Sequence, residues 1–173
     1  MIEWAVSFAE KFGPFTLLFL AYSDSLFFLG YIFWGIPLLA SLLALILLDA
    51  VEPTAAFLLC FIGTFLGSAT NFFLSELIWN RAKGRLPKRV LNISGFLRRQ
   101  NIIFATLAFT AAKFWTGSRP IAGALAGVAE IQVMRYVLME VIATAIWVGF
   151  WCVVAYTFTE EIIGFFSLEG IIR

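Results

Sequence analysis

The sequence predicts an all-α integral membrane protein, because apolar residues are in excess, charged residues are few, and apolar runs reach spanning length. Of its 173 residues, 62% are hydrophobic and 13% are charged, whereas a soluble domain carries about 25% charged residues. The mean hydropathy is +0.95. A soluble surface needs more polar side chains than this chain has, so the surplus apolar side chains are expected to face lipid. The length predicts a single membrane domain over residues 1–173.

The first long apolar region covers residues 10–48 and is expected to form either a re-entrant hairpin or two spans. From residue 12 onwards it contains no basic residue and one carboxylate, Asp24. Polar neighbours of Asp24 mark one break in the run, and Gly35 with Pro37 marks another. Under either interpretation the chain returns to the side it left, and the N-terminus is expected outside. The start lacks the basic region of a signal peptide, so it is expected to be retained.

Two later runs are long enough to cross a membrane, because about 20 helical residues span the hydrocarbon. They are residues 54–79, which contain Glu76, and residues 136–158, which contain Glu140. Between the first of these and the next apolar run, residues 80–101 carry seven basic residues and no acidic one. The positive-inside rule favours a cytoplasmic segment here over a nucleic-acid site, and the cluster also suits anionic lipid headgroups.

The run at residues 102–129 is apolar except for Lys113 and Arg119, which divide it into two arms. Neither arm is long enough to span as a helix, so a second re-entrant hairpin with an enclosed tip is expected. Residues 159–173 are too short to cross again and are expected at the interface. A chain with two spans and two hairpins is expected to need a second copy of itself to enclose the hairpin tips. A homodimer is therefore a hypothesis. Glycines at helix-packing spacing are expected to serve ordinary close packing: Gly63, Gly67, Gly123 and Gly127.

Ionisable residues within the apolar segments are the candidate functional groups, because a charge inside the membrane costs about 2.5–3.5 kcal/mol on insertion scales. Arg119 and Lys113 are the candidates for binding an anion, since a guanidinium matches phosphate or carboxylate geometry. A structural ion pair is the alternative for both. Asp24 is the candidate proton-carrying acid and the natural partner of Arg119, because scarce water opposes its ionisation while a neighbouring arginine favours it. Glu140 and Glu76 are weaker candidates for the same proton-linked role.

The weaker candidates have plain structural alternatives. Glu140 lies about a turn inside its run, where an ion pair with Arg135 or snorkelling to the interface competes with a transport role. Glu76 and Glu130 fall at the edges of apolar segments, where a solvated position explains each of them.

Few residues suit catalysis or metal binding. The chain has no histidine and two cysteines, Cys60 and Cys152, which are expected to be buried small apolar residues. Their spacing supports neither a disulfide nor a metal pair. No nucleophile has a matched base, so an enzyme is the least expected class, and no cofactor or metal is expected. Proton transfer would have to use carboxylates or lysine.

Several segments share a pattern with one known family. They are Lys113-Phe114-Trp115-Thr116-Gly117-Ser118-Arg119, Ala126-Gly127, Arg135-Tyr136, Trp147 and, upstream, Ser23-Asp24-Ser25-Leu26 and Gly67-Ser68-Ala69-Thr70-Asn71-Phe72. The later segments resemble the signature of the DedA family (SNARE-associated, VTT-domain proteins), which runs Gly-Arg-Phe-x-Pro-Gly-x-Arg, Ala-Gly, Arg-Phe and then Trp. The upstream segments resemble the family's first hairpin and first full span. Together they cover most of residues 10–158.

The chain departs from that pattern at several positions. Lys113 replaces the first arginine, Thr116 and Gly123 replace prolines, Ser68 replaces aspartate, and Glu140 replaces asparagine. Residues 38–49 resemble an insertion, and the family's final span has no counterpart. Lysine keeps the charge of arginine but loses bidentate recognition, so the general role carries over and the exact substrate does not.

The resemblance implies a multi-pass protein of the bacterial cytoplasmic (inner) membrane with two facing re-entrant hairpins. It implies proton-coupled translocation of a lipid phosphate, such as undecaprenyl phosphate or a phospholipid. Arg119 and Lys113 would hold the phosphate and Asp24 would be the proton-linked acid, with Glu140 and Glu76 as helpers. Two alternatives stay open: a proton-coupled antiporter of a small ion or solute, and a structural membrane protein without cargo.

Overall fold

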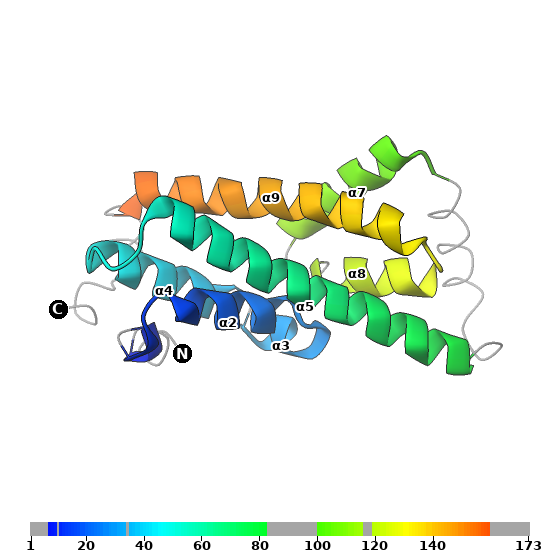
Figure 1. The fold of residues 1–173 in the computed structure, drawn as a ribbon, viewed down its shortest axis with the longest axis horizontal. Coiled ribbons are helices and arrows are strands. Elements are labelled where there is room, and N and C mark those ends of the chain that lie inside the picture. The colour runs from blue at the N-terminus through cyan, green and yellow to red at the C-terminus, as the bar shows by residue number, and fades with distance from the viewer. Residues whose placement is uncertain (1–6, 10, 34, 83–99, 116–118, 160–173) are drawn as a thin grey trace.

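The computed structural model describes residues 7–9, 11–33, 35–82, 100–115 and 119–159 (Figure 1). Every regular element in these residues is an α-helix, which confirms the predicted all-α class for the described part of the chain. The helices are, in order, α2 (Phe15–Ser25), α3 (Phe27–Phe33), α4 (Ile36–Leu47), α5 (Pro53–Ala82), α7 (Ile102–Phe114), α8 (Arg119–Val128) and α9 (Val133–Thr157).

Two of these helices are long and apolar enough to cross a membrane. They are α5 over Pro53–Ile78 and α9 over Val133–Thr157, and they occupy the two runs predicted to span. Large apolar side chains point outward along both, for example Leu66 on α5 and Ile146 on α9. A surface of this kind suits lipid better than water. In Figure 1 the two helices run lengthwise and the short helices pack beside them.

Residues 10–48 contain three short helices. α2, α3 and α4 have 11, 7 and 12 residues, and a helix of that length does not cross the hydrocarbon. α2 runs inward from one end of the molecule and α4 returns to the same end (Figure 1). Both breaks fall where the sequence places them, after Asp24 and at Gly35. Gly35 has a φ of 76°, a left-handed conformation that glycine adopts at little cost.

Residues 102–129 form a second inward-and-back course from the opposite end of the molecule (Figure 1). Its two helices, α7 and α8, have 13 and 10 residues. The Asn101 side chain caps α7 by accepting a hydrogen bond from the backbone N–H of Ile103 at 3.1 Å. Residues 116–118, in the middle of the tip that was predicted around Lys113 to Pro120, lie outside the described residues.

The returning helices α4 and α8 end in the same way. The residues that follow their C-caps, Asp49 and Glu130, have positive φ angles of 49° and 52°. In each case this residue and the next donate their backbone N–H groups to carbonyls of the last helical turn, which is the Schellman arrangement. Each ending leads within a few residues into one of the two long helices. Glu130 is thus an exposed helix-terminating residue, in agreement with its predicted edge position.

Glycines allow both hairpins to pack closely on α5, as the sequence predicted. A Cβ atom on Gly67 would lie 2.6 Å from the carbonyl oxygen of Tyr22 and from the Cβ of Ser25, both on α2. On the other hairpin, a Cβ atom on Gly123 of α8 would lie 2.9 Å from the carbonyl oxygen of Ser68. Contacts this short leave no room for a side chain, so these glycines fix how near α2 and α8 come to α5.

Three predictions fall partly or wholly outside the described residues. They concern the N-terminal segment, most of the basic segment 80–101, and almost all of the tail 159–173. Their placement stays a prediction from the sequence.

Candidate functional site: a paired-charge cluster between the hairpins

The two hairpins meet through a buried ion pair. Arg119 Nη1, at the start of α8, lies 2.8 Å from Asp24 Oδ2, near the end of α2. The two side chains are 9% and 3% exposed. The two atoms are not aligned for a hydrogen bond, so the contact is mainly a charge–charge attraction. The structure thus brings together the cation and the acid that the sequence paired.

The first hairpin also holds Asp24 from its own return helix. The backbone N–H of Gly35 donates a hydrogen bond of 2.8 Å to Asp24 Oδ1. A Cβ atom on Gly35 would lie 3.6 Å from Arg119 Nη2 and 3.8 Å from Asp24 Oδ2, so the backbone comes close to the ion pair here. On the opposite side, the Arg119 guanidinium lies over the ring of Trp147 at 4.5 Å from its centroid, a distance at which a cation–π attraction operates.

Lys113 belongs to a second buried ion pair and does not contact Asp24 in the described interactions. Its Nζ atom lies 2.7 Å from Glu140 Oε1, and both side chains are 1% exposed. Thr144 donates a 3.0 Å hydrogen bond to the same carboxylate oxygen. Lys113 Nζ also lies 3.5 Å from Ser68 Oγ. The cluster therefore contains two acids and two bases, paired one to one and carried by four helices, α2, α7, α8 and α9.

The alternative pairing of Glu140 with Arg135 is wrong. Arg135 donates to the backbone carbonyl of Gln100, before α7. Residues five positions apart lie on different faces of a helix, because neighbours on one face are three or four positions apart. Glu140 faces the interior of the bundle, where Lys113 neutralises it.

Glu76 lies outside this cluster. It follows Ser68 by about two helical turns on α5 and is partly exposed. This agrees with the edge position that was its structural alternative.

Asn71 is a buried residue that the sequence did not single out for a role. Its Nδ2 donates a 2.7 Å hydrogen bond to the carbonyl of Ser25, and its Oδ1 accepts a 3.1 Å hydrogen bond from the backbone N–H of Phe27. Both bonds hold backbone groups at the break between α2 and α3, directly after Asp24. In the sequence the only signal was an amide side chain inside a spanning run. That signal does not predict which groups the amide binds.

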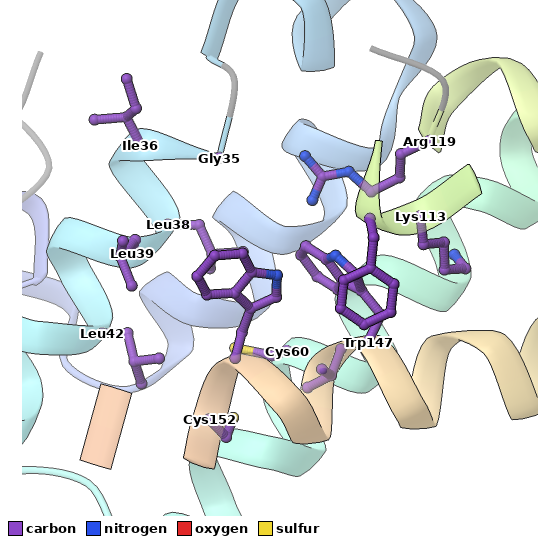
Figure 2. A pocket seen from close by; sticks show the side chains of 13 residues that line it. Gly35, Ile36, Leu38, Leu39, Leu42, Cys60, Lys113, Arg119, Trp147 and Cys152 are labelled. Atoms are coloured by element: carbon purple, nitrogen blue, oxygen red, sulfur yellow. The ribbon is translucent and has the colours of Figure 1, made fainter. Parts of the chain in front are cut away.

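A cavity of about 170 Å³ lies beside the cluster. Figure 2 shows Arg119 and Lys113 on one side of it and the leucine side chains of α4 on the other, among them Leu38, Leu39 and Leu42. Three of its lining residues are also exposed on the outside of the molecule, namely Ile36 at 39%, Phe114 at 44% and Trp151 at 37%. The cavity therefore joins the paired-charge cluster to an apolar outer surface.

Among the described residues, no group of three or more His, Cys, Asp or Glu side chains is placed to hold a metal ion. Comparisons of this chain with known protein families, with curated proteins and with solved structures found no match.

Proposed function

We propose that this chain is a DedA-like transporter of the bacterial cytoplasmic membrane that moves a lipid phosphate, undecaprenyl phosphate or a phospholipid, in a proton-coupled way. One observation carries the proposal. A buried arginine–aspartate pair, Arg119 with Asp24, joins two short-helix hairpins beside a cavity whose rim is apolar. An arginine in such a place can bind an anion, and Asp24 competes with any incoming anion for its guanidinium group.

In this proposal both hairpins are re-entrant. α2, α3 and α4 enter from one side of the bilayer, α7 and α8 enter from the other, and α5 and α9 cross it completely. Broken helices with charged tips near the bilayer midplane are a common way for secondary transporters to build a binding site. Irregular backbone at that depth requires an enclosing protein surface, which the close packing of α2 and α8 against α5 supplies.

Coupling follows from the cost of an unpaired buried charge. Removing one partner of a buried ion pair costs about 3–5 kcal/mol. Arg119 therefore needs an anion in every state, which is either ionised Asp24 or the phosphate of the cargo. When Asp24 takes up a proton, it releases Arg119 to the phosphate; when the phosphate leaves, Asp24 ionises and pairs with Arg119 again. Proton and phosphate then bind together, and by linkage each favours the other.

Lys113 and Glu140 form a second site of the same kind in this proposal. Both cations are already paired with an acid, but the Arg119 side chain is 9% exposed and the Lys113 side chain is 1% exposed, so Arg119 is the first contact for the phosphate. Lys113 joins it only when Glu140 is protonated. Glu76, on the same long helix as Ser68 but nearer the basic segment, is a helper for proton entry. The apolar tail of the cargo leaves through the rim at Ile36, Phe114 and Trp151 into the surrounding lipid.

The test is the movement of labelled undecaprenyl phosphate and of labelled phospholipid between the leaflets of proteoliposomes, with and without a pH gradient. Wild type is compared with Arg119→Gln and Asp24→Asn. The matched controls are Lys11→Gln and Glu52→Gln, which remove the same charges at exposed positions. The proposal predicts gradient-stimulated movement in wild type and both controls, and background movement in the two site variants.

Other outcomes favour the alternatives. Proton flux driven by a soluble ion, with no lipid movement, would indicate a small-ion or small-solute antiporter. Background movement in every sample, together with loss of folding in Arg119→Gln and Asp24→Asn, would indicate a structural role for the pair. The homodimer remains a prediction, which a mass measurement of the protein in mild detergent tests.

A further inference from the structure

The two cysteines of the chain line the same cavity. Cys60 comes from α5 and Cys152 from α9, and they are 4% and 8% exposed. Both are free thiols, both line the cavity beside the charged cluster, and both belong to the same packed cluster of buried residues. In the view of Figure 2, Cys60 lies to the right of Leu42 at about the same height, and Cys152 lies lower. The expectation that both cysteines are buried is confirmed.

Access to this thiol pair runs from the outer surface of the molecule. The residues that line the cavity and are also exposed are the large apolar side chains Ile36, Phe114 and Trp151. A reagent that enters past them must be soluble in lipid. The cavity volume is about 170 Å³, and an apolar cavity of roughly 150 Å³ admits a benzene ring. A six-membered ring with small substituents therefore fits beside the two thiols.

We propose that Cys60 and Cys152 form a thiol–disulfide site that is oxidised by a lipid-soluble quinone. Two S–H bonds break and one S–S bond forms. The two electrons and two protons pass to the quinone, which becomes a hydroquinone. A quinone matches this site because it is neutral, planar and apolar, and because it accepts the number of electrons and protons that a dithiol releases.

The product would link the two long helices covalently. A disulfide between Cys60 and Cys152 fixes α5 to α9 at the wall of the cavity that carries Trp147 and Val148. The site is independent of the proposed transport, because its chemistry needs neither the ion pairs nor a lipid phosphate. Its test therefore measures thiols and quinone, without any measurement of lipid movement.

The experiment uses the full chain, fully reduced, in lipid nanodiscs. The probe is a short-tailed benzoquinone with every ring position substituted, so that thiols cannot add to the ring. After incubation the protein is denatured and treated with N-ethylmaleimide, and its intact mass gives the number of remaining thiols. The proposal predicts loss of both alkylation sites, loss of two hydrogen atoms from the mass, one quinone reduced per chain, and full reversal by dithiothreitol.

Two further measurements separate proximity from oxidation. Cys60→Ser and Cys152→Ser each keep one alkylatable thiol, and neither reduces the quinone with this stoichiometry. Phenylarsine oxide, which condenses with two neighbouring thiols and releases water, blocks both alkylation sites of the wild type without any substitution. Failure of the arsenical to block them overturns the proposed thiol pair. If the arsenical blocks both thiols but the quinone leaves both of them free, the quinone site is overturned. A disulfide found only between two chains also overturns it.

Discussion

The pair Lys113–Glu140 gives the most quantitative prediction, because its geometry leaves little room for compensation. The 2.7 Å contact joins side chains that are each 1% exposed. Glu140→Gln keeps the shape of the side chain and an oxygen that accepts the hydrogen bond from Thr144, but it removes the negative charge. The cost is then that of leaving the Lys113 ammonium buried without a counter-charge, which is about 3–5 kcal/mol of unfolding free energy.

The assay is equilibrium unfolding of the purified protein in mixed dodecyl maltoside–SDS micelles, followed by tryptophan fluorescence. Lys113→Met combined with Glu140→Gln removes the unpaired cation and keeps the bulk of the lysine stem. We expect this double variant to be about 2 kcal/mol more stable than Glu140→Gln alone, since the two substitutions are coupled. The matched control is Glu76→Gln, the same chemical change at a partly exposed position, which is expected to cost no more than about 0.5 kcal/mol.

A loss of less than about 1 kcal/mol of unfolding free energy in Glu140→Gln would contradict a buried lysine that depends on this counter-charge. So would a double-variant cost equal to the sum of the two single costs, because the residues would then not act as a pair.

Three further predictions use the same unfolding assay. Gly67→Ala should lower the free energy of unfolding by about 1–3 kcal/mol, because the added Cβ atom overlaps α2. The control is Gly149→Ala, whose Cβ atom has an ordinary 3.7 Å contact and which should change the free energy of unfolding by at most about 0.5 kcal/mol. Equal effects of the two substitutions would contradict the close packing of α2 on α5. Asn71→Leu should lower the free energy of unfolding by about 1–3 kcal/mol, because it removes the two buried hydrogen bonds from this amide to backbone groups at the α2–α3 break. An unchanged stability would contradict that role. Trp147→Leu should lower the free energy of unfolding by about 1–2 kcal/mol, because it removes the cation–π contact with Arg119. An unchanged free energy of unfolding would argue against that contact.

The sequence predicted the course of the chain because that course depends on local properties. α5 and α9 follow from the length and apolar character of their runs, and the ends of α2, α4 and α7 follow from polar or glycine interruptions. The ion pair of Arg119 with Asp24 was also within reach, because each charge is isolated in an apolar run and needs a partner somewhere in the fold.

The partners of Lys113, Cys60 and Asn71 could not be predicted. Each depends on the rotation and the height of one helix relative to another, and a single sequence does not specify either quantity. Lys113 has several acids within plausible reach, and only the packing of α7 against α9 selects Glu140. In the same way, only the register of α5 against α9 brings Cys60 to Cys152.

The central claim is that Arg119 exchanges ionised Asp24 for the phosphate of a lipid. The most direct measurement is the initial rate at which labelled undecaprenyl phosphate crosses the bilayer of proteoliposomes under an imposed pH gradient, for folded wild type and folded Asp24→Asn. The account predicts that the gradient accelerates wild type and that Asp24→Asn moves no more lipid with the gradient than without it. An equal acceleration by the gradient in both proteins would contradict the account.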